Sequence, residues 1–143
     1  MYEMLEIVKR LLLLGSLLYF AWQDYHTHYI SVVAAVITGI IGIGMRFLIE
    51  GNMVVRGVLV SMIVGLGLII ISVVFRESIG LGDGILFLVS GCYMNIFENM
   101  ILLVRTIFLT GGFAFLCLVI GKIKEGARIP MAPFMLAAYV TIL

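Results

Sequence analysis

Two aspartates, Asp24 and Asp83, are the only ones in this chain, and they are the residues best suited to catalysis. Two carboxylates held within about 3 Å share one proton, so one can activate a water molecule as a base while the other protonates the leaving group. That is the chemistry of aspartyl peptide hydrolysis, which needs neither a metal nor an organic cofactor. The alternative for either residue taken alone is an ordinary helix cap or a solvated helix end.

Asp83 lies within three glycines, in the segment Gly80-Leu81-Gly82-Asp83-Gly84. Gly80, Gly82 and Gly84 permit positive φ angles and a close approach of another backbone, so they could aim the Asp83 side chain inward and leave a groove for an extended peptide. A glycine-rich turn between two membrane helices is the plainer alternative. The pattern G-x-x-x-x-G-K-[ST] is absent, which excludes a phosphate loop of that type.

The elements that must position these carboxylates are apolar helices. The chain has 143 residues, of which 64% are hydrophobic and 12% charged, with a mean hydropathy of +1.26. Soluble domains are about half apolar and about a quarter charged. We therefore predict an all-α, polytopic membrane bundle forming one domain over residues 1–143, with the lipid bilayer as its surroundings and no nucleic-acid partner.

Because Glu3 and Glu6 precede Lys9 and no small-residue cleavage site follows, we read the N-terminus as the first membrane helix rather than a removable signal.

About 20 residues are needed to cross a bilayer, and on that basis we expect about six transmembrane helices. The stretch 84–121 is short for two full crossings, so a tilted or partly re-entrant pair is an alternative there. The six predicted helices cover 4–23, 30–48, 54–75, 84–97, 99–121 and 130–143.

Counting crossings places both aspartates on one side of the membrane. Asp24 would follow the first helix, Asp83 would precede the fourth, and the basic loop 122–128 would follow the fifth. The positive-inside rule favours the cytoplasm for this side, because Lys122, Lys124 and Arg128 form the densest basic cluster. Basic residues predicted on the other side oppose this choice: Lys9, Arg10, Arg46 and Arg56.

The remaining polar residues suggest less. His26 and His28 follow Asp24, but two ligands without a third make a poor metal site, so we predict none. Interfacial exposure explains the pair more simply than tuning of the aspartates or contact with a substrate. Arg105 falls inside the predicted helix 99–121, where it could pair loosely with Glu98 or face a polar cavity.

Three motifs in order along the chain resemble those of the type IV prepilin peptidase family. Gly80-Leu81-Gly82-Asp83 is similar to its G-x-G-D signature, and Asp24 with Ile30 reproduces the spacing of its D-x5-I-P segment, with Ser31 where proline is usual. The segment 129–134, which contains Pro130 and Pro133, is similar to the family's [IL]-P-x-x-P-F stretch. The resemblance covers nearly the whole chain. Departures are Ser31, Val32 in place of a common asparagine, and Ile85 in place of a frequent lysine.

The resemblance implies a membrane aspartyl endopeptidase that removes short basic leader peptides from type IV pilin-like precursors, with Asp24 and Asp83 as the catalytic pair. It also implies the plasma membrane of a prokaryote, a site facing the cytoplasm, and a minimal form without the N-methyltransferase region of larger members. Two rivals stay open. One is a protease similar to presenilin or signal peptide peptidase, and the other is a non-enzymatic scaffold or transporter-like bundle whose aspartates bind a cation or a partner.

Overall fold

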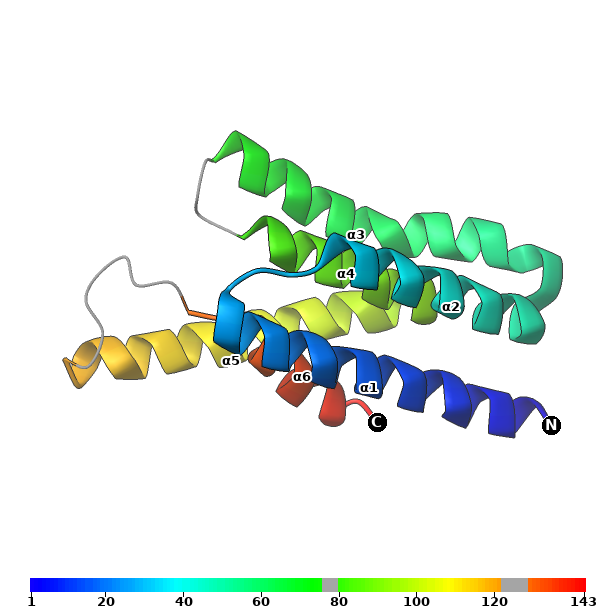
Figure 1. Cartoon of the computed structure of the whole chain (residues 1–143), viewed down its shortest axis with the longest axis horizontal. Helices are drawn as coiled ribbons and strands as arrows, with labels where there is room; N and C mark the ends of the chain where they lie inside the picture. The colour runs from blue at the N-terminus through cyan, green and yellow to red at the C-terminus, as the bar shows by residue number, and fades with distance from the viewer. Residues whose placement is uncertain (76–79, 122–128) are drawn as a thin grey trace.

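The protein is an elongated bundle of α-helices, seen in a computed structural model that describes residues 1–75, 80–121 and 129–143 (Figure 1). Within these ranges there are six α-helices, one short 3-10 turn and no strand, which confirms the all-helical prediction. The helices are α1 (Tyr2–Thr27), α2 (Val32–Glu50), α3 (Val54–Val74), α4 (Leu81–Tyr93), α5 (Ile96–Val119) and α6 (Ala132–Val140); the 3-10 turn η1 is Gly51–Met53.

Helix boundaries follow local signals that the predicted ranges missed at both aspartates. α1 continues past residue 23 to Thr27 and ends where His28 takes a left-handed φ of 54° and donates its N–H to the carbonyl of Asp24. Asp24 therefore lies in the last turn of α1 and not after it. α4 begins at Leu81 rather than residue 84, so Asp83 lies in its first turn, where a negative charge interacts favourably with the helix dipole.

The later helices also differ from their predicted ranges. α5 begins earlier than predicted, because the Asn95 side chain accepts the N–H of Glu98 while the Glu98 carboxylate accepts the N–H of Asn95, a capping box. α6 begins at Ala132, so Pro130 lies before the helix and not in its first turn, where Pro133 lies instead. A proline at this position costs no hydrogen bond, because the first N–H groups of a helix have no partner within it.

Helix α4 is the centre of the bundle and packs against α1, α2, α3 and α5. Its closest neighbour is α3, and the approach depends on glycine. A β-carbon added to Gly84 would lie 2.5 Å from Cγ1 and 3.1 Å from the backbone nitrogen of Ile69. The buried Asn99 of α5 adds polar contacts, donating to the carbonyls of Ser61 and Phe87 and accepting from the hydroxyl of Ser90. These contacts fix the helix that carries Asp83.

The outside of the bundle is apolar, whereas soluble proteins rarely expose large contiguous apolar surface. Two helical stretches are long and apolar enough to cross a membrane: Val32–Val74, which contains α2 and α3, and Ile96–Val119, which is α5. Large side chains such as Phe108 and Phe115 of α5 are exposed. The 13 residues of α4 and 9 of α6 give helices of about 20 and 14 Å, less than the roughly 30 Å of a bilayer core. Six complete crossings thus stay a prediction.

Candidate active site

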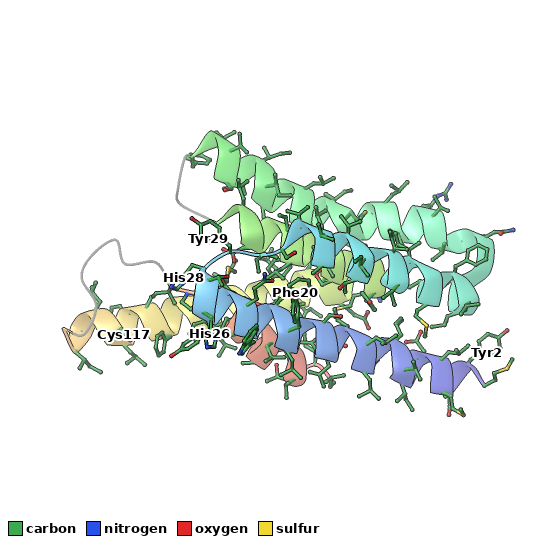
Figure 2. The ribbon with its side chains drawn as sticks, viewed as in Figure 1. Tyr2, Phe20, His26, His28, Tyr29 and Cys117 are labelled. Atoms are coloured by element: carbon green, nitrogen blue, oxygen red, sulfur yellow. The ribbon has the colours of Figure 1, made fainter. Side chains whose placement is uncertain are left out.

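The end of α1 and the beginnings of α4 and α6 lie at the same end of the bundle, drawn at the left of Figure 1. These helix ends carry Asp24, Asp83 and the segment that contains Pro133. The labelled side chains of His26, His28 and Tyr29 gather at this end in Figure 2, whereas Tyr2 lies at the opposite end. The fold therefore brings the three sequence motifs to the same end of the bundle.

Asp24 is buried and is held by the first turn of α6. It is 8% exposed, and its Oδ2 accepts the backbone N–H of Ala132 at 3.1 Å. Ala132 is the first residue of α6, so this N–H has no partner within its own helix. Helix N-termini also carry a partial positive charge that favours a nearby carboxylate. A carboxylate can accept about four hydrogen bonds, so this contact leaves acceptor sites on Asp24 for other donors.

Helix α6 is fixed at both of its ends. Near its start, the ring of Phe134 packs against that of Phe113 on α5, with 5.1 Å between the ring centroids. At its end, Nη1 of Arg105 donates to the carbonyl and the hydroxyl of Thr141, at 2.8 and 2.7 Å. Arg105 therefore stabilises the negative end of α6. Two alternatives were open for Arg105, a loose pairing with Glu98 or a polar cavity, and the structure gives it Thr141 as a partner instead. Glu98 caps α5, and its Oε1 lies 3.8 Å from Nη2 of Arg10.

Asp83 is half-buried at the start of α4. Its N–H donates to the carbonyl of Gly80 at 3.0 Å, which closes the first turn. A β-carbon added to Gly80 would lie 3.1 Å from Oδ2 of Asp83, so the carboxylate folds back over that glycine. A side chain at position 80 would require the Asp83 carboxylate to shift by a few tenths of an ångström.

Ile30 connects the two aspartate-bearing helix ends. It lies in the connection between α1 and α2, and its side chain packs onto Gly82, where an added β-carbon would lie 2.8 Å from Cγ1 of Ile30. Asp83 is the next residue. The connection that follows Asp24 is therefore in contact with the turn that carries Asp83. A shared proton and a water bound between the two carboxylates stay predictions.

The three glycines around Asp83 each contact a different neighbour. Gly80 lies under the Asp83 carboxylate, Gly82 contacts Ile30, and Gly84 packs on α3. The groove that they were predicted to open for a peptide stays a prediction.

The two histidines have local partners. Nδ1–H of His26 donates to the carbonyl of Trp22 at 2.9 Å, and its ring contacts those of Trp22 and Tyr25. His28 forms the left-handed end of α1. The basic residues used for orientation, Lys122, Lys124 and Arg128, lie outside the described residues.

Two participants in this arrangement were not predicted. One is the backbone N–H of Ala132, which no side-chain pattern could reveal. The other is Gln23, whose Oε1 accepts the N–H of Ser31 at 3.2 Å. A polar residue directly before Asp24, at the end of an apolar helix, was the available signal for Gln23.

Comparisons of this chain with family models, with curated proteins and with solved structures gave no match. The case for a function therefore depends on the residues and their contacts.

Proposed function

We propose that this protein is a membrane aspartyl endopeptidase that cleaves the leader peptide from type IV pilin-like precursors, with Asp24 and Asp83 as the catalytic pair. The observation that carries the proposal is the hydrogen bond from the N–H of Ala132 to Oδ2 of Asp24. It joins the last of the three motifs to the first aspartate, across 108 residues of sequence. The contact of Ile30 with Gly82 supports the same grouping for the second aspartate.

The proposed chemistry uses the two carboxylates and one water molecule. The deprotonated carboxylate takes a proton from the water, which attacks the carbonyl carbon of the scissile peptide bond. The protonated carboxylate protonates the departing nitrogen, so the pair ends with the same total of one proton.

The surroundings suit a substrate with a charged leader and an apolar helix. The apolar exterior of the bundle supports insertion in a membrane. The plasma membrane of a prokaryote, with the aspartate end facing the cytoplasm, is the location that the resemblance implies. In that position the apolar part of a precursor would stay in lipid while its leader reaches the pair. An aspartate at a membrane interface also has water available for hydrolysis.

The test is cleavage of pilin-like precursors by the purified protein in lipid nanodiscs. We expect Asp24→Asn and Asp83→Asn each to abolish cleavage, because an amide can act neither as the base nor as the acid. The control is Glu3→Gln, the same carboxylate-to-amide change at an exposed residue in the first turn of α1. Normal processing by either aspartate variant would refute the aspartyl mechanism.

Adding a signal-peptide remnant as a second substrate, and a measurement of cation binding, separates the rival functions. Cleavage inside a signal-peptide remnant, with no cleavage of the pilin-like precursor, would favour a presenilin-like protease. A protein that cleaves neither substrate but binds a cation, and loses that binding in both variants, would favour the non-enzymatic alternative.

A further inference from the structure

The connection between α1 and α2, residues 28–31, is hydrogen-bonded to α1 and packs against α4. On the α1 side, the N–H of Ser31 donates to Oε1 of Gln23 at 3.2 Å. On the α4 side, Ile30 packs onto Gly82, the residue before Asp83. Gln23 is itself the residue before Asp24. One short chain of contacts, from Gln23 through Ser31 and Ile30 to Gly82, therefore joins the two aspartates.

The backbone of this connection explains why Ser31 needs a partner. Ser31 is the N-cap of α2, and its side chain accepts the N–H of Ala34 at 3.4 Å. The N–H of an N-cap residue has no partner inside the helix. Ser31 is only partly exposed, and a donor that loses contact with water without gaining an acceptor destabilises the folded state. The Gln23 side chain supplies the missing acceptor and ties the start of α2 to the end of α1.

We propose that Gln23 is a positioning residue, which holds the 28–31 connection so that Ile30 sets the place of the Gly82–Asp83 turn relative to Asp24. The inference rests on the proposed function, and it assigns Gln23 no contact with the substrate. Displacement of a reacting group by about 1 Å can cost about 100-fold in rate. A hydrogen bond outside the catalytic pair can therefore govern the rate of cleavage.

The φ angle of Ser31 offers a way to replace the hydrogen bond. Ser31 has φ −68°, which is the value that a proline ring imposes. A proline at this position has no N–H to satisfy, and it restricts the preceding residue, Ile30, to extended conformations. Ser31→Pro should therefore hold the connection without help from Gln23. Because it also removes the hydroxyl that caps α2, Ser31→Pro alone is the reference for the double variant.

The first experiment measures cleavage kinetics of a pilin-like precursor in lipid nanodiscs. Gln23→Met keeps the length of the side chain and removes the acceptor. We expect kcat to fall about tenfold or more with KM changed less than about twofold, because the substrate-binding surface is untouched. Adding Ser31→Pro to Gln23→Met should restore most of kcat. A fall in kcat that Ser31→Pro leaves uncorrected would overturn the inference, since it would mean that Gln23 acts in another way.

The second experiment needs no substrate. In a Cys92→Ala, Cys117→Ala background, Ile30→Cys and Gly82→Cys place two thiols at the contact, where the β-carbons would be 3.5 Å apart. That separation lies within the range of a disulfide. We expect rapid oxidative crosslinking when Gln23 is present, slower crosslinking in Gln23→Met, and recovery on adding Ser31→Pro. Gln23→Glu, which keeps an acceptor oxygen, should crosslink like the parent.

The two experiments separate the inference from the proposed function. If no pilin-like precursor is cleaved by the unmodified protein but crosslinking responds to Gln23→Met, the function fails and the positional role stands. If the precursor is cleaved and Gln23→Met changes neither kcat nor crosslinking, the function stands and the role of Gln23 is refuted.

Discussion

Replacing Gly82 by alanine tests whether contact with Ile30 sets the place of Asp83. The new β-carbon would lie 2.8 Å from Cγ1 of Ile30 and 3.5 Å from its Cβ. The first distance is shorter than a van der Waals contact, and Ile30 is β-branched and stiff at χ1, so it cannot easily turn away. Overpacking of this kind costs about 1–3 kcal/mol. The helix preference of alanine over glycine returns up to about 1 kcal/mol.

The net effect on stability should thus be about 0–3 kcal/mol by these two terms. The effect on cleavage should be larger, because the turn that carries Asp83 must move to relieve the contact. We expect kcat for a pilin-like precursor to fall about 100-fold for a shift of about 1 Å. Unfolding in detergent and cleavage in lipid nanodiscs measure the two effects separately.

Two variants control this experiment. Gly112→Ala makes the same change on α5 at a position where an added β-carbon meets nothing within 4 Å, so it should leave cleavage unchanged. Adding Ile30→Ala to Gly82→Ala removes the Cγ1 atom that is struck but keeps the two β-carbons in contact at 3.5 Å, so part of the lost activity should return. Unchanged cleavage by Gly82→Ala, or no recovery in the double variant, would refute the reasoning.

Two further predictions concern the helices that support the site. Asn99→Leu removes the amide that bonds to Ser61, Phe87 and Ser90. It should lower the free energy of unfolding, measured in detergent, by about 1–3 kcal/mol. Unaltered stability would contradict the role given to this buried network. Arg105→Met removes both hydrogen bonds to Thr141, so amide hydrogen exchange at the end of α6 should become faster while exchange in α4 stays the same. Equal exchange at the end of α6 in the variant and the unmodified protein would argue against capping by Arg105.

Composition and hydropathy were sufficient to predict an all-helical chain, because apolar runs of about 20 residues have few other solutions. They could not give the helix ends, since a boundary depends on which N–H and carbonyl groups find partners. α1 passes Asp24 because the left-handed turn comes only at His28. The start of α5 was readable from Asn95 and Glu98 as a capping box, and that signal was overlooked.

For the candidate site, side-chain types indicated which residues to consider, but not what holds them. Asp24 and Asp83 were identified because they are the only aspartates and because counting crossings predicts both on one side of the membrane. The partner of Asp24 is a backbone group of Ala132, which has no signature in the sequence. The role of Arg105 was likewise hidden, because its acceptors belong to the end of a helix whose length was overestimated.

The bond between Asp24 and Ala132 has a consequence for the order in which the protein is made. Asp24 leaves the ribosome before Ala132, which follows 108 residues later. Asp24 therefore gains its α6 partner only after α2 to α5 have been synthesised and α6 has docked. Under the proposed function, nascent chains that still lack α6 lack this contact with the first aspartate, so we expect them to be unable to cleave other membrane proteins during biogenesis.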